Sequence, residues 1–189
     1  MLAVSTNKKA TRPARLAPIL ESGGAVDSES LTVGEVMAMH DALERNAATL
    51  LGQMLFCFGR LDLSLGLCLA LIGSVAEFEA RSRKYGRAGF GFNKKLERLQ
   101  KIISALPEDS NSRAAYLEWI ERAHALRIVR NDLAHGRWGF EAGHAINVVG
   151  LPSGTQRQTA YTLEQLASIV EDLRTLTNDL NCLRVKSRL

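Results

Sequence analysis

The sequence feature that most restricts the fold is a set of apolar residues between positions 50 and 72. They recur at intervals of three and four, which places them along one side of an α-helix. They are Leu50, Leu51, Met54, Leu55, Phe58, Leu61, Leu65, Cys68, Leu69 and Ile72. One helix cannot bury such a stripe alone, so other helices must cover it. The pattern predicts one long helix, or two in line, ending near Ile72 inside a helical bundle.

Two more helices follow from apolar spacing and from end signals. The first covers about residues 94–106 and is stopped by Pro107, which cannot continue a helix. The second begins near Ser112 and ends at His135. Its end is expected there because Gly136 stands where a left-handed C-terminal cap usually lies.

A β-hairpin and a last helix complete the predicted fold. The β-prone segments 145–149 and 157–161 flank Pro-Ser-Gly at 152–154, which is typical of a hairpin. Thr162 and Gln165 then form a capping box, the sequence signature of a helix start. The leucine-rich seam behind it comprises Leu166, Ile169, Leu173, Leu176, Leu180 and Leu183. We therefore predict an all-α fold: a bundle of four or five helices with a small hairpin before the last one.

Charge divides the chain into two regions. The net charge is +4, but Lys8, Lys9, Arg12 and Arg15 lie in the first twenty residues, which contain no acid. The rest of the chain is neutral overall. Residues 1–30 are therefore predicted to be a disordered basic tail, and residues 31–189 the helical domain, with the hairpin at about 137–161.

The cysteines and the longest apolar run indicate in which cellular compartment the protein is located. Cys57, Cys68 and Cys182 show neither a CxxC pair nor metal-ligand spacing, which favours buried thiols in a reducing, cytoplasmic setting. The longest apolar run, residues 61–75, is interrupted by polar residues and glycines and is too short to span a bilayer. We expect no membrane partner and no metal or other cofactor.

Basic residues gather between positions 81 and 101. They are Arg81, Arg83, Lys84, Arg87, Lys94, Lys95, Arg98 and Lys101, with Glu97 as the one acid. Interleaved aromatic residues could stack on bases, so Lys94 and Lys95 are candidate RNA contacts. The alternative is a solvated basic segment beside two core phenylalanines.

The strongest chemical signal is Arg130-Asn131, followed by His135, at the end of the second predicted helix. A histidine transfers protons near neutral pH, and an arginine binds phosphate through two parallel hydrogen bonds. Asn131 lies one turn before His135, on the same face. Arg130, however, is about 140° around the helix from His135. One chain does not converge them easily, so we predict a composite site in a two-fold homodimer.

These residues resemble the motif of the HEPN superfamily, an Arg, a polar residue and then a His: here Arg130-Asn131-x-x-x-His135. The wider stretch Leu126-Arg127-x-x-Arg130-Asn131-x-x-Ala134-His135-Gly136-x-Trp138 is similar to bacterial members, as is Phe58-Gly59-Arg60-Leu61-Asp62. Asp62 departs from the more common Glu. The resemblance covers about residues 33–189 in outline.

The resemblance implies an all-α homodimer that cleaves RNA without a metal, as toxins and phage-defence proteins do, with an antitoxin or another regulatory protein as partner. Arg130, Asn131 and His135 would be catalytic. Arg127, Arg137 and Trp138 would join Lys94 and Lys95 in binding the substrate.

Other interpretations stay open. The domain could be a catalytically silent module that binds nucleotide, RNA or a partner protein, or a purely structural helical dimer. Arg130 could form a structural salt bridge with Asp62 or Glu118. His135 could only cap the helix, and Trp138 could cover the end of the bundle.

Overall fold

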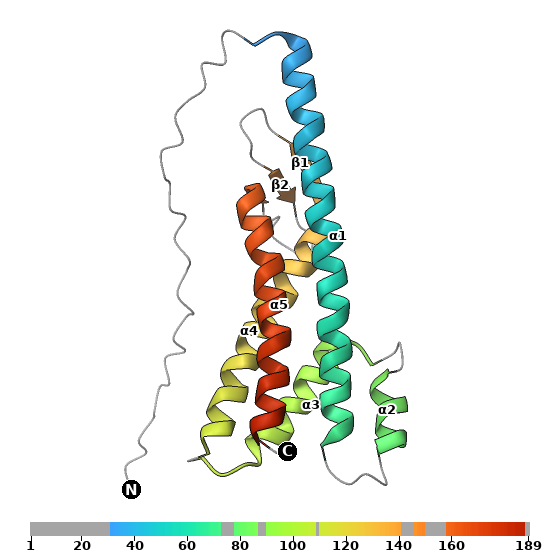
Figure 1. Cartoon of the computed structure of the whole chain (residues 1–189), viewed down its shortest axis with the longest axis vertical. Coiled ribbons are helices and arrows are strands. Elements are labelled where there is room, and N and C mark those ends of the chain that lie inside the picture. The colour runs from blue at the N-terminus through green and yellow to red at the C-terminus, as the bar shows by residue number, and fades with distance from the viewer. Residues whose placement is uncertain are drawn as a thin grey trace, which may run out of the picture. The chain divides into compact units, whose positions relative to one another are not determined.

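The computed structural model describes residues 31–72, 78–86, 90–108, 110–140, 146–149 and 158–187. The predicted disordered tail, residues 1–30, lies outside the described residues. The described part is mostly helical and contains a small antiparallel sheet (Figure 1). The elements are α1 Val33–Leu71, α2 Phe78–Gly86, α3 Phe92–Ser104, α4 Asn111–His135, β1 Arg137–Phe140, β2 Ile146–Val149, β3 Gln158–Tyr161 and α5 Leu163–Ser187.

Helix α1 is the central element, and it packs against each of the other four described helices. α5 lies beside it and runs in the same direction, while α4 runs the opposite way (Figure 1). Most of the apolar stripe predicted from the sequence is buried, including Met54, Phe58, Leu61 and Leu65. Of the two alternatives predicted, one long helix or two in line, the structure shows one continuous helix. Leu55 is an exception, because it lies at the edge of the stripe and is exposed.

Helix α2 was not predicted; it lies between the helix expected to end near Ile72 and the one expected to start near residue 94. It forms because it can bury Tyr85, whose ring packs edge-on against Phe90 with a centroid separation of 5.2 Å. Its last turn is also basic, which suits the negative end of a helix dipole. A tertiary contact here outweighs weak local propensity.

Helices α4 and α5 are joined by a buried hydrogen bond. The indole N–H of Trp119 donates to the carbonyl oxygen of Leu176 at 2.8 Å. The predicted capping box of α5 is confirmed in both directions. The backbone N–H of Thr162 donates to Oε1 of Gln165, and that of Gln165 donates to Oγ1 of Thr162.

The predicted hairpin is confirmed by the pairing of β2 with β3, in which Ile146 lies opposite Tyr161. Its connecting residues lie outside the described part of the chain. A third strand, β1, was not predicted and pairs antiparallel with β2, Arg137 opposite Val149. Ile146 and Val148 are buried, and β2 contacts the end of α4. The sheet therefore holds the chain that leaves α4 against the bundle.

The cysteines differ in exposure. Cys57 and Cys68 are buried as predicted, but Cys182 is exposed, so the prediction of three buried thiols is wrong for that residue. Burial raises the pKa of the Cys68 thiol from 9.0 to about 11.

Within the described residues, α1 is long and apolar enough to cross a membrane by length and composition. Half of its most apolar stretch is buried inside the bundle. A core helix has the same composition, so this finding is weak evidence for a membrane and the absence of a membrane partner stays a prediction.

Candidate functional site

The residues of the predicted motif lie on the last two turns of α4. The helix starts at Ser110, whose hydroxyl oxygen accepts from the backbone N–H of Arg113, and it ends at His135 as predicted. The reason given for that end was wrong. Gly136 has φ −72° and ψ 162°, an extended conformation rather than a left-handed one. Glycine is required by space, because a Cβ there would lie 2.5 Å from Cγ1 of Val148.

Arg130 connects α4 to α1. Its guanidinium carbon lies 4.8 Å from the centre of the Phe58 ring, a cation–π contact. Its Nη1 also donates to Oδ1 of Asn131 at 3.0 Å. These two contacts hold the guanidinium on the flank of α1. The salt bridge between Arg130 and Asp62 considered from the sequence does not form, since Asp62 pairs with Lys95.

Arg127 lies one turn before Arg130, and both side chains are half-buried. In each, the Nε atom is buried and has no hydrogen-bond partner. Within the described part of the chain, neither guanidinium pairs with a carboxylate. Arg127 and Arg130 are therefore two cations, three positions apart on α4, that no described carboxylate neutralises by an ion pair.

His135 and Asn131 complete the motif in different settings. The imidazole of His135 is exposed at the helix terminus, where a substrate can reach it. Asn131 is half-buried, and its amide oxygen accepts from Arg130. The separation of Arg130 and His135 around α4, about 140°, remains as the sequence predicts. Arg130 faces α1, whereas His135 faces solvent.

The residues after the helix have unequal roles. The indole N–H of Trp138 donates to the carbonyl oxygen of Leu133 at 2.9 Å, so this side chain ties β1 to the last turn of α4. It is half-buried and lies 6.5 Å, between ring centres, from Phe140. The contacts of Trp138 thus support a role in covering the end of the bundle. Arg137, in contrast, is exposed on β1.

The two candidate lysines of α3 also differ. Lys94 is exposed and lies two residues after Phe92, whose ring contacts Phe58 beneath Arg130 at 4.7 Å. Lys95 is only 4% exposed, and its Nζ bonds Oδ1 of Asp62 at 2.8 Å. Lys95 is therefore a structural ion-pair partner and is not placed to contact RNA. The sequence could not show this pairing across 33 positions.

Two neighbours of the site were not identified from the sequence. Phe58 was recognised as a core residue, but not as the platform under Arg130. Tyr161 of β3 has a raised pKa, caused first by burial and then by the negative charge of Asp132. Asp132 is half-buried near this phenol.

Other features lie away from the motif. His40, Asp41 and Glu44 form the described group that could hold a metal ion, and all three are exposed. Glu44 lies about 20 Å along α1 from the Phe58 platform. A shallow hollow of about 200 Å³ lies between α1 and α5, and one of about 210 Å³ lies between α4 and α5. Neither hollow is lined by a motif residue.

Comparison of the chain with protein-family models, with curated proteins and with solved structures finds no match.

Proposed function

We propose that this protein is a metal-independent endoribonuclease of the HEPN type that cleaves RNA with Arg130, Asn131 and His135. The observation that carries the proposal is the condition of Arg127 and Arg130: two adjacent guanidinium groups, each with a buried Nε atom lacking a partner and neither paired with a described carboxylate. An unsatisfied buried donor costs about 1–3 kcal/mol. A phosphate bound by the outer nitrogens of the two guanidinium groups would neutralise both charges.

The chemistry assigns a distinct role to each group. Cleavage begins when a base removes the proton of a ribose 2′-hydroxyl, whose oxygen then attacks the adjacent phosphorus. Arg130 stabilises the negative charge that develops on the phosphate oxygens. A protonated group finally donates to the leaving 5′-oxygen. An exposed imidazole such as His135 performs either proton step near neutral pH.

The two proton steps explain why a second copy is needed. One step requires a base and the other an acid, whereas the motif of one chain contains a single histidine. A two-fold dimer would supply two imidazoles and two guanidinium groups. It would also bring together groups that a single α4 points in different directions. Regulation by an antitoxin or another protein is part of this proposal.

A catalytically silent binding module is the second candidate. The hydrogen bond from Arg130 to Asn131 favours it, because the amide oxygen is then occupied within the chain. Such a module would bind RNA or nucleotide through Arg127, Arg130 and Lys94 without cleaving it.

The test is incubation of the purified protein with total RNA, with and without EDTA. We expect cleavage that persists in EDTA and falls by about 10²–10⁴-fold in His135→Ala and Arg130→Ala. His124→Ala is the matched control, since His124 lies on the same helix with no assigned role, and it should keep full activity. Full activity of His135→Ala, or cleavage that EDTA abolishes, would refute the mechanism. Binding of RNA without cleavage would establish the silent module instead.

A further inference from the structure

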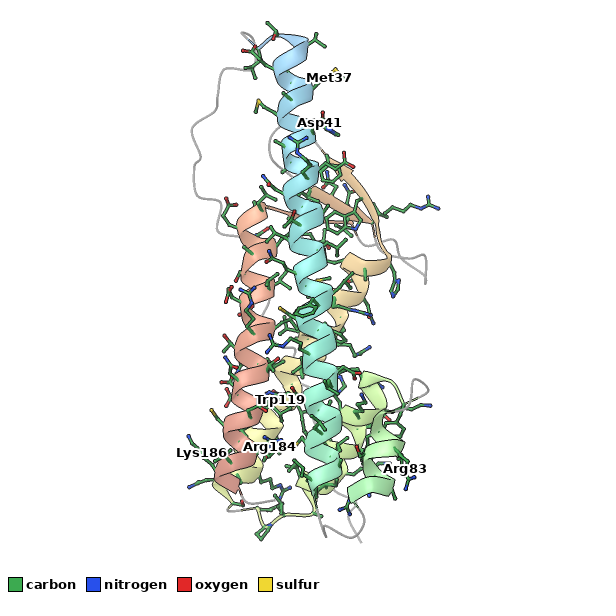
Figure 2. All side chains as sticks on the ribbon, turned by 45° about the vertical axis from the view of Figure 1, so that its right-hand side comes forward. Met37, Asp41, Arg83, Trp119, Arg184 and Lys186 are labelled. Carbon is green, nitrogen blue, oxygen red and sulfur yellow. The ribbon has the colours of Figure 1, made fainter. Side chains whose placement is uncertain are left out.

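The shallow hollow between α1 and α5 combines two arginines with neutral polar groups. The two helices lie side by side along the bundle (Figure 2). The hollow has a volume of about 200 Å³, and about one turn of each helix lines it: Cys57 and Arg60 from α1, and Arg174, Thr177 and Asn178 from α5. None of the described residues that line it is acidic.

Arg60 is an isolated charge on α1. Between positions 48 and 71 this helix contains just two charged residues, Arg60 and Asp62, and Asp62 is paired with Lys95. Arg60 is exposed, and within the described part of the chain no carboxylate forms an ion pair with it. No internal ion pair therefore explains a cation at this position beside the hollow.

Arg174 reaches the hollow from α5. Its Nη1 donates to Oε1 of Glu171, which lies one turn earlier on the same helix. Both side chains are largely exposed, and water screens an ion pair of this kind. The sulfur of Cys57, as a hydrogen-bond acceptor, is the largest cause that raises the pKa of Arg174, ahead of the charge of Glu171. The guanidinium of Arg174 therefore lies against α1 and keeps further N–H donors for a ligand.

Two neutral groups of α5 complete the lining. Asn178 is exposed, and its amide offers two N–H donors. The hydroxyl of Thr177 donates to the carbonyl oxygen of Leu173 at 2.9 Å, so only its oxygen is left for other contacts. The hollow thus presents mainly positive charge and hydrogen-bond donors, which are complementary to an anion.

We propose that this hollow binds the phosphate group of a small phosphorylated molecule, held by Arg60 from α1 and by Arg174 and Asn178 from α5. Two guanidinium groups match a doubly charged anion, because each donates two parallel hydrogen bonds. A phosphate monoester carries a charge of about −1.5 to −2 at pH 7 and three acceptor oxygens. The hollow is smaller than the roughly 300–1,000 Å³ of pockets for drug-sized ligands, so the bound molecule is small.

The hollow is separate from the proposed RNA site. Phe58, on which Arg130 packs, follows Cys57 on α1, but the two side chains leave the helix about 100° apart. No residue of the motif lines the hollow. Phosphate binding here depends on Arg60 and Arg174, so this proposal and the proposed function can each fail without the other.

The test is titration of the full chain with inorganic phosphate and with glycerol 3-phosphate, followed by nuclear magnetic resonance. We expect both to bind with a dissociation constant of roughly 0.1–1 mM, as a few charge-assisted hydrogen bonds to a small anion allow. Arg60→Gln and Arg174→Gln should each weaken binding at least about tenfold. Arg98→Gln is the matched control, because Arg98 is exposed on α3 and does not line the hollow. It should leave the dissociation constant unchanged, and circular dichroism verifies folding of each variant.

Three further measurements separate binding in the hollow from a general attraction of anions to a basic protein. Asn178→Phe keeps every charge but fills the hollow, so it should weaken binding about as much as Arg60→Gln. Succinate, whose two charges lie on separate carboxylates, should bind at least about tenfold more weakly than phosphate. Phosphate should shift the Nε–Hε signals of Arg60 and Arg174 and leave that of Arg98 in place.

The absence of saturable binding up to about 20 mM, far above the expected dissociation constant, would overturn the proposal. Unchanged binding by Arg60→Gln, or succinate bound as tightly as phosphate, would also overturn it. Loss of binding in Arg130→Gln but not in Arg60→Gln would place the phosphate at the motif instead. Phosphate binding in the hollow of a chain that cleaves no RNA would leave this proposal standing, and RNA cleavage by a chain without it would leave the proposed function standing.

Discussion

Replacing Gly136 with alanine should loosen the junction between α4 and the sheet. The new Cβ would lie 2.5 Å from Cγ1 of Val148, 3.1 Å from the carbonyl oxygen of Val149 and closest of all to the carbonyl oxygen of Asp132. The carbonyl oxygen of Asp132 accepts a hydrogen bond from the backbone N–H of residue 136 at 2.8 Å. It therefore cannot move away from the new Cβ without weakening this bond. Overpacking costs about 1–3 kcal/mol and the hydrogen bond adds about 1 kcal/mol.

We therefore expect the free energy of unfolding to fall by about 2–4 kcal/mol, and Tm by roughly 4–16 °C for a chain of this size. Thermal unfolding followed by circular dichroism measures the change. Gly139→Ala is the control, because a Cβ at that position of β1 meets nothing within 4 Å. It should leave Tm unchanged or slightly raised. If Gly136→Ala melts within about 2 °C of the unsubstituted protein, steric crowding does not require a glycine at position 136.

The remaining predictions concern buried polar groups. Asp62→Ala should cost about 3–5 kcal/mol in urea unfolding, because it removes the carboxylate that pairs with the Lys95 ammonium, whose side chain is only 5% exposed and which then keeps its 3.2 Å bond to the carbonyl oxygen of residue 62. Lys95→Met should cost about 1–2 kcal/mol, since the Asp62 side chain is 35% exposed and remains hydrated; the opposite order would contradict the assignment. In the native protein Cys182 should react with a thiol reagent at pH 8 while Cys68 stays protected, and equal labelling would show that the bundle is open. Because the Cys68 pKa rises from 9.0 to about 11, the native state keeps a proton that the unfolded chain loses. This stabilisation is complete below pH 9 and declines by about 2–3 kcal/mol as pH rises to 11; a Cys68→Ala variant should lack that part of the decline.

The HEPN-type motif and the composite site remain predictions from sequence. The structure adds that Arg130 packs on the ring of Phe58 and that His135 is exposed. It also shows that Lys95 is buried in an ion pair with Asp62, so Lys95 is no longer a candidate RNA contact. Spacing along α4 could predict which turn each motif residue occupies, because 3.6 residues per turn is a local property. It could not predict which neighbours occupy each side of that turn.

Local chemistry explains the parts of the fold that the sequence determined by itself. The C-terminal half of α1 follows from apolar periodicity, and the start of α5 follows from the reciprocal bonds of Thr162 and Gln165. Both depend on residues within a few positions of one another. Tertiary structure alone decided the burial of Lys95 against Asp62, the addition of β1 to the hairpin and the extended conformation of Gly136. Each of these depends on groups from different elements, from 6 positions apart (Phe140 opposite Ile146) to 33 (Asp62 and Lys95), where a hydrogen bond or a steric contact outweighs the local preference of the chain.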